Sequence, residues 1–311
     1  MATSPQTTVN VPAPPRRRGD RLSRLAGNKY ILLLPAVLAL AAVAGYPLFY
    51  GIRASFTKYR YGRDVGSAGF SNYDTILHDA TFWTAMLTTA KYVVVAVTIE
   101  TILGLLLALL LTRELRFGGL LRVGLIIPMT IAPVVVGVMW RLMYASDVGV
   151  VNPLFEALGL PAPNVLTHET SAFIGVVIVD VWEWTPLMFL IILAGLQSLP
   201  QEPLEAARVD GAGPLRTFFD QTLPLLRPVL VVAIVLRVID AIGTFDQIFV
   251  LTRGGPGTST QLISIYAYNT AFQFTQYGEA MAMVIALLLV MVLLFIFAIR
   301  RLRRSALQVS G

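Results

Sequence analysis

The stretch "EAARVDGAGPLRTFFDQTLPLLRP", Glu205 to Pro228, alternates acidic and basic residues between two long apolar segments, and this contrast decides the fold. Its neighbours, residues 172–196 and 229–251, are almost wholly apolar, and a helix of about 20 such residues can cross a bilayer. The whole chain of 311 residues is 56% hydrophobic and only 14% charged. Soluble domains carry roughly a quarter charged residues. The composition therefore favours a polytopic membrane protein over a soluble α-helical protein.

Apolar segments along the chain predict an all-α membrane protein with six transmembrane helices. They are Tyr30–Gly51, Tyr92–Leu111, Leu121–Tyr144, Ala172–Leu196, Val229–Leu251 and Ala280–Ile299. The first segment is too long for the apolar region of a signal peptide, so it is expected to stay in the protein. Interior prolines predict bends in two segments, because each proline removes a backbone hydrogen bond. These prolines are Pro35 and Pro47 in the first segment, and Pro128 and Pro133 in the third.

Lysine and arginine in the connections predict the orientation. One side of the membrane receives Arg16, Arg17, Arg18, Arg21, Arg24, Lys29, Arg113, Arg116, Arg122, Arg208, Arg216, Arg227, Arg300, Arg301, Arg303 and Arg304. The other side receives Arg53, Lys58, Arg60, Arg63 and Arg253. The richer side is predicted to be cytoplasmic and to hold both termini. The net charge of +6 thus belongs to membrane flanks, and no nucleic-acid partner is expected.

Three regions follow from this pattern. Residues 1–29 form an Arg/Pro-rich cytoplasmic N-terminal tail, residues 30–304 the transmembrane domain, and residues 305–311 a C-terminal tail. Residues 202–224 lie between the fourth and fifth segments, on the cytoplasmic side. They differ from the rest of the domain because they are amphipathic.

The local sequence of residues 202–224 predicts a short helix, a tight turn and a second helix. Pro203 suits a first helical position, Glu205 suits a first turn, and Gly211 suits a stop. The second helix should start at Gly213–Pro214 and end at Pro224 and Pro228. Its apolar side could pack on the chain's own helix ends or dock into another protein, and the residues leave both possibilities open.

The same stretch resembles the EAA motif of permease subunits in binding-protein-dependent ABC importers. That motif runs E-A-A, three residues, glycine, and a hydrophobic stretch ending L-P; these places are filled by Glu205, Ala206, Ala207, Gly211, Leu223 and Pro224. Two further stretches are similar to carbohydrate-type permeases, the second of them to the first of their two permease subunits. They are "IPMTIAPVVVGVMWRLMYASDVGVVNPLFEALGL" and "FDQIFVLTRGGPGTSTQLISIYAYNTAF".

The resemblance implies the type I permease fold of ABC importers, with residues 202–224 as a coupling helix held in a groove of an ATPase. It implies a charged contact from Glu205 and a turn at Gly211; the remaining coupling residues are Ala206, Ala207, Asp210 and Pro224. It also implies a second permease in a heterodimer, two ATPase subunits, an extracytoplasmic substrate-binding protein, membrane lipid and a sugar substrate. The expected location is the bacterial cytoplasmic membrane.

No chemistry of an enzyme is expected in this chain. The phosphate-binding pattern G-x-x-x-x-G-K-[ST] is absent from the sequence, so ATP and Mg should be bound by the partner ATPase and no cofactor by this chain. There is no cysteine, and His78 and His168 are predicted to be solvated loop residues. A membrane-embedded hydrolase lacks a nucleophile and base.

Polar residues inside the apolar segments are candidates for a substrate path, because such residues face a cavity or each other. The candidates are Glu183, Trp184, Arg237, Asp240, Asp246 and Gln247, with Glu100 and Asp180 ranked lower. Asp240, Thr244 and Gln247 are expected on one helical face. Arg237 could instead pair with Asp240, three residues away, or with Glu183 across helices.

Other transport functions stay open. A polyol or a glycerophosphodiester could replace the sugar, whereas the stretch "LTRGGPGTST" argues against an amino-acid importer. A secondary transporter driven by an ion gradient through Asp240 or Glu100 is the rival from another class. That rival has no use for residues 202–224.

Overall fold

The computed structural model describes the backbone of residues 29–112 and 118–309 and divides the chain into two units, residues 1–51 and 52–311. In the first unit, α2 (Lys29–Leu40) continues through the π-helix η1 (Ala41–Gly45) into α3 (Tyr46–Ser55). The π-helical turn lies directly before Pro47, whose ring nitrogen has no hydrogen to donate. The helix thus changes type next to Pro47, whereas Pro35 lies within α2, and the bend predicted for this segment stays a prediction. The tail at residues 1–28 lies outside the described residues.

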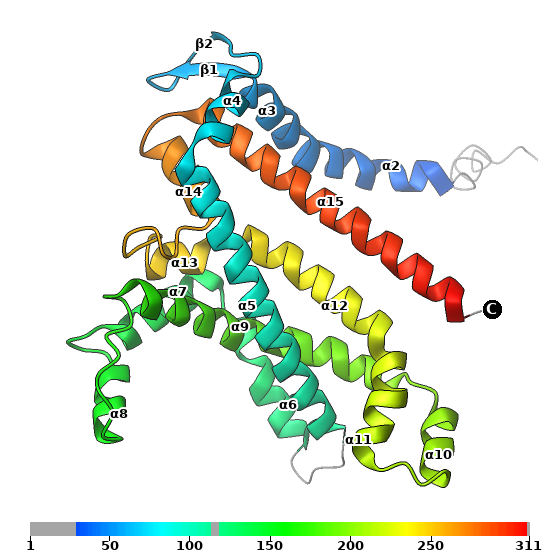
Figure 1. The fold of residues 1–311 in the computed structure, drawn as a ribbon. Helices are drawn as coiled ribbons and strands as arrows, with labels where there is room; N and C mark the ends of the chain where they lie inside the picture. Colours follow the sequence, from blue (N-terminus) through cyan, green and yellow to red (C-terminus); the bar gives the residue numbers. More distant parts are fainter. Residues whose placement is uncertain (1–28, 113–117, 310–311) are drawn as a thin grey trace, which may run out of the picture. The chain divides into compact units, whose positions relative to one another are not determined.

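The second unit is built from helices, with one small β-hairpin before them (Figure 1). The strands β1 (Thr57–Arg60) and β2 (Arg63–Ser67) pair antiparallel. The helices are α4 (Ser71–His78), α5 (Ala80–Leu111), α6 (Gly118–Ile126), η2 (Pro128–Thr130), α7 (Pro133–Tyr144), α8 (Val151–Ala157), α9 (Glu169–Gln197), α10 (Gln201–Val209), α11 (Pro214–Thr217), η3 (Phe218–Thr222), α12 (Leu223–Gly243), α13 (Asp246–Leu251), α14 (Ile263–Phe272) and α15 (Tyr277–Val309).

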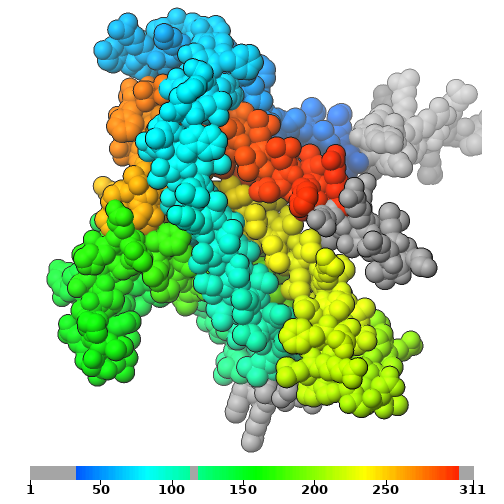
Figure 2. All heavy atoms as spheres, viewed as in Figure 1, coloured from blue at the N-terminus to red at the C-terminus, as the bar shows by residue number. Residues whose placement is uncertain are grey.

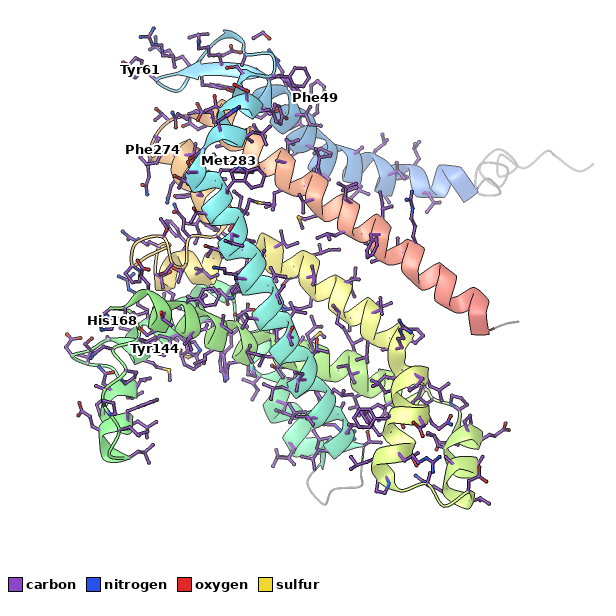
Figure 3. All side chains as sticks on the ribbon, in the orientation of Figure 1. Phe49, Tyr61, Tyr144, His168, Phe274 and Met283 are labelled. Atoms are coloured by element: carbon purple, nitrogen blue, oxygen red, sulfur yellow. The ribbon has the colours of Figure 1, made fainter. Side chains whose placement is uncertain are left out.

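The centre of this unit is the crossing of α5, α9 and α12, each of which packs on the other two. α5 and α9 approach each other closely at Gly104, where an added Cβ would lie 2.9 Å from both the Met188 Cβ and the Phe189 nitrogen. α13 packs on α7, while α4 and α14 pack on α15. Met283 of α15 belongs to the last of these groups and lies in a buried cluster with Ile76 and Ile263 (Figure 3).

Four helices of the described residues are long and apolar enough to cross a membrane, at Leu33–Ser55, Ala80–Leu111, Glu169–Gln197 and Tyr277–Arg300. They correspond to the first, second, fourth and sixth predicted segments. The third is interrupted, as its prolines predicted: η2 starts at Pro128 and α7 at Pro133. The fifth was wrong as a single helix, because α12 ends at Gly243 and α13 begins at Asp246. The count of six transmembrane segments stays a prediction.

Two helices extend beyond the predicted segments. α5 begins at Ala80, twelve residues before the predicted start of the second segment at Tyr92. The Asp79 side chain caps this helix start by accepting a hydrogen bond from the Thr81 nitrogen at 2.8 Å. α15 continues into the predicted C-terminal tail, residues 305–311, as far as Val309. The β-hairpin was not predicted; its turn places both Tyr61 and Gly62 at positive φ.

Candidate coupling and transport sites

The predicted helix, turn and helix at residues 202–224 is present, and hydrogen bonds fix its turn. α10 ends where the Gly211 nitrogen donates to the Arg208 oxygen at 3.1 Å and the Ala212 nitrogen donates to the Ala207 oxygen at 2.9 Å. This pair of bonds is the Schellman arrangement, in which the residue after the helix end is left-handed. Gly211 fills that position with φ +78°. The glycine predicted as a stop thus has a defined structural role.

Details of the two helices differ from the prediction. α10 starts at Gln201, so Pro203 is its third residue, and the acidic residue of the first turn is Glu202 instead of Glu205. The second helix does not end at its prolines. η3 leads into α12, where the Leu223 nitrogen donates to the Phe218 oxygen five residues back. This wider turn accommodates Pro224, which has no N–H to continue the α-helical pattern.

The apolar side of this region is uncovered. The exposed fractions of Val209, Leu215 and Phe219 are 87%, 76% and 60%. α10 and α11 lie at the far end of α12 from α13, where they form an end of the second unit (Figure 2). A hollow of about 280 Å³ lies between them; its lining is Pro203, Ala206, Ala207, Asp210, Ala212, Arg216, Thr217, Asp220 and Gln221. Leu204 and Phe218, on the same side, are half-buried. The chain's own helix ends therefore leave most of this side free, and docking into another protein stays a prediction.

A buried cluster of charges joins α5, α9 and α12 at their crossing. Arg237 of α12 is fully buried, and its Nε lies 2.8 Å from Oε2 of Glu100 in α5, which is also fully buried. Its Nη2 contacts the carboxylate of Asp180 in α9, and its Nη1 donates to Oδ2 of Asp240 at 3.0 Å. The guanidinium also lies 5.3 Å from the ring centroid of Trp184. One cation thus holds carboxylates from three helices.

The cluster extends to α13 through Gln247, whose Nε2 donates to Oδ1 of Asp180 at 2.7 Å. α13 in turn packs tightly on α7: an added Cβ on Gly137 would lie only 2.8 Å from the Gln247 backbone oxygen. Gln247 is only 2% exposed. The break between α12 and α13 therefore turns Gln247 into a buried link, and the expectation that it shares one helical face with Asp240 was wrong.

The predicted substrate-path residues divide into two groups. Arg237 and Gln247 are buried in the cluster, whereas the side chain of Asp240 is 48% exposed and Asp246 is exposed at the start of α13. Glu183 is 1% exposed, and its Oε2 has no hydrogen-bond partner among the described residues. The pairing of Arg237 with Asp240 is confirmed, and the alternative pairing with Glu183 is wrong.

Sequence reasoning ranked Glu100 and Asp180 low as substrate-path residues and did not predict that they pair with Arg237. A buried arginine is retained only with counter-charges, because an unpaired charge inside a protein is costly. Glu100 is the one acidic residue within the second apolar segment, and Asp180 lies inside the fourth together with Glu183; that placement was the available signal. The relative rotation of the three helices decides which acids meet Arg237, and the sequence of one segment alone does not determine that rotation.

Comparison with known proteins gives the family. The model for "Binding-protein-dependent transport system inner membrane component" matches residues 100–307, more than half of the chain. The chain belongs to this family. This permease is therefore a membrane component without enzyme chemistry of its own, in a transport system that depends on a binding protein.

Similar proteins share most of this permease's length. A probable ABC transporter permease protein, y4oQ of Sinorhizobium fredii, is 42% identical over 271 residues, which cover 86% of each chain. The trehalose/maltose transport system permease protein MalF of Thermococcus litoralis is 44% identical over 227 residues, 73% of this permease and 76% of that protein.

A solved structure shows the same fold. It is the crystal structure of a bacterial ABC transporter involved in the import of the acidic polysaccharide alginate. One chain of it superposes with a TM-score of 0.78 over 93% of this permease and 99% of that chain, at 23% identity. The expected fold of an ABC importer permease is thereby confirmed.

Proposed function

We propose that the chain is the permease subunit of an ATP-driven importer that moves a sugar across the bacterial cytoplasmic membrane by alternating access. The observation that carries this is the 44% identity to the trehalose/maltose permease of Thermococcus litoralis. A trehalose permease, SugA of Mycobacterium tuberculosis, is 36% identical over 90% of both chains and supports the same substrate class.

The uncovered side of α10 and α11 supports docking to an ATPase on the cytoplasmic side. A rigid short helix can transmit closure of an ATPase pair as a tilt of the helices behind it. Here α12 follows η3 without a break, so a push on α11 passes directly along α12 toward Arg237. The assembled importer would contain a second permease, two ATPase subunits and an outer binding protein, with ATP and Mg bound by the ATPases. Both termini would be cytoplasmic.

Asp240 is the strongest candidate for contact with the solute. A carboxylate can accept hydrogen bonds from two sugar hydroxyls, and Asp240 is half-exposed while its second oxygen is not used by Arg237. Asp246 is exposed one short loop away. Arg237 and Gln247 would hold these residues in place, with Glu183 and Trp184 beside them on α9.

Reconstitution of the chain with the products of its neighbouring genes tests the function. A screen of saccharides and polyols, each with the binding protein, should find one that stimulates ATP hydrolysis and is taken up. Stimulation by a polyol alone would change the substrate class. Accumulation of the solute on an ion gradient without nucleotide would contradict the proposal.

The variant Glu205→Ala tests the coupling region. Glu205 is exposed, so its removal should leave the fold intact and remove a charged contact to the ATPase. We expect ATP hydrolysis without matching uptake, or looser assembly of the importer. Glu202→Ala, in the first turn of the same helix, is the matched control. Normal uptake by Glu205→Ala would remove the role assigned to this residue.

A further inference from the structure

The β-hairpin formed by β1 and β2 is a surface that the transport mechanism does not use. Lys58, Arg60 and Arg63 are exposed on it, and Asp64 is the one acidic residue within residues 57–67. The ion pairs found among residues 33–112 and 118–300 include none of these cations. Three cations against one anion leave the hairpin with an excess of two positive charges that face solvent.

The base of the hairpin is held firmly by the helices below it. Nδ2 of Asn72 in α4 donates to the Ser55 oxygen at 2.8 Å and to the Thr57 oxygen at 3.0 Å. Gly278 of α15 approaches so closely that an added Cβ would lie 2.4 Å from the Thr57 oxygen. The hairpin is thus presented on a fixed support, which favours binding because little conformational freedom is lost.

The tip carries an aromatic side chain in an unfavourable backbone conformation. Tyr61 and Gly62 have φ of +52° and +75°, as a type I′ turn requires. A bulky residue seldom takes this conformation, and such strain concentrates at functional positions. Tyr61 is 86% exposed, and the Arg60 guanidinium lies 5.9 Å from its ring centroid. Tyrosine and arginine are the residue types that dominate binding energy at protein interfaces.

We infer that this hairpin docks an acidic patch of the substrate-binding protein. The inference rests on the proposed function, which puts the end of the unit that bears the hairpin, opposite α10 and α11, on the outer side (Figure 1). Phe274, in the connection between α14 and α15, is exposed at the same end as Tyr61 and extends the surface (Figure 3). Because the hairpin carries excess positive charge, the surface of the partner that it contacts is expected to be negatively charged.

A protein partner fits the hairpin better than anionic lipid does. All five residues of β2 are exposed, and Val65 is the one large apolar side chain among them. A strand that lay against lipid would present an apolar face, because the acyl boundary takes up apolar side chains. β2 instead leaves both of its faces free for polar contacts.

The test uses the complete importer in nanodiscs of neutral phosphatidylcholine. The quantity measured is the concentration of sugar-loaded binding protein that gives half-maximal stimulation of ATP hydrolysis, at low and high salt. The triple variant Lys58→Glu, Arg60→Glu, Arg63→Glu should raise this concentration by about tenfold or more and reverse its salt dependence. The charge-preserving triple Lys58→Arg, Arg60→Lys, Arg63→Lys is the matched control and should leave it unchanged.

A second variant changes the charge in the other direction. Asp64→Asn keeps the oxygen that accepts the Gly66 N–H at 2.9 Å and removes the acidic charge of the hairpin, so it should lower the half-maximal concentration. The triple variant should still assemble and reach the wild-type rate at saturating binding protein. An unchanged half-maximal concentration would overturn the inference, as would an effect that appears only when phosphatidylglycerol is present. If the wild type itself is not stimulated, the proposed function fails together with the role of the hairpin.

Discussion

At the scale of single residues, Arg237 links the three helices that cross at the centre of the second unit. It lies fully buried among carboxylates from α5, α9 and its own helix α12. A buried ion pair adds little net stability compared with an apolar pair, but removal of one partner leaves the others without compensation. Arg237 therefore stabilises the crossing of three helices chiefly because its absence would be costly.

Arg237→Met should lower the free energy of unfolding by about 3–5 kcal/mol, since Glu100 and Asp180 would stay buried without their counter-charge. Thermal unfolding of the purified protein and its yield in detergent measure the loss. Arg237→Met combined with Glu100→Gln and Asp180→Asn should recover much of it. A single variant as stable as the wild type would contradict this account of the cluster.

Asp240 should respond differently, because its side chain is 48% exposed. Asp240→Asn keeps the size of the side chain and removes its charge, so the free energy of unfolding should change by less than about 1 kcal/mol while sugar uptake falls. Uptake and thermal stability are measured on the same preparation. Glu156→Gln, an exposed acid on α8, is the control that should leave both unchanged. Unchanged uptake by Asp240→Asn would exclude it from the substrate path.

At the scale of elements, the turn between α10 and α11 allows the effect of backbone conformation to be tested apart from the effect of side-chain contacts. Gly211 has φ +78°, and an added Cβ there would have no heavy atom within 4 Å. Gly213 is as open, yet its φ is −68°. The two glycines of one turn therefore form a matched pair for substitution.

Gly211→Ala should weaken coupling between ATP hydrolysis and uptake, because a non-glycine residue in the left-handed region costs roughly 1–2 kcal/mol. Gly213→Ala should transport normally. The ratio of sugar taken up to ATP hydrolysed is the readout, with assembly checked by size-exclusion chromatography. Equal ratios for the two variants would show that the left-handed turn does not matter for coupling.

The elements also show how far the sequence could predict the structure. Pro128, Pro133 and Gly211 each act on their own backbone neighbours, and each interruption was predicted from one residue. The break after Gly243 was missed because the apolar run continues to Leu251 in spite of it. Pro224 was misread as a stop, since the wider turn of η3 that absorbs it depends on the following helix.

At the scale of the whole molecule, the contact of α5 with α9 sets the spacing of the core. The Cβ added to Gly104 would meet backbone and Cβ atoms of Met188 and Phe189, which cannot move aside as a flexible side chain could. Neither helix reveals this contact in its own sequence, since a glycine within an apolar run can equally face lipid. The partners of Arg237 were hidden for the same reason.

Gly104→Val should separate α5 from α9 and lower the free energy of unfolding by about 1–3 kcal/mol, the usual cost of overpacking. Thermal unfolding in detergent measures the change. Gly124→Val on α6, where an added Cβ meets nothing within 4 Å, controls for the poor helix propensity of valine. Similar losses in both variants would mean that propensity, and not the crossing, accounts for the effect.

The pairing of one guanidinium with carboxylates of three helices also limits which substitutions homologous sequences can accept. Loss of Arg237 alone is expected to destabilise the protein until Glu100 and Asp180 are also replaced by neutral residues, because a buried acid without its partner is costly. These three positions should therefore vary together across homologues, either all retained or all replaced. An alignment in which the arginine is frequently absent while both acids are retained would show that another group can compensate the two acids.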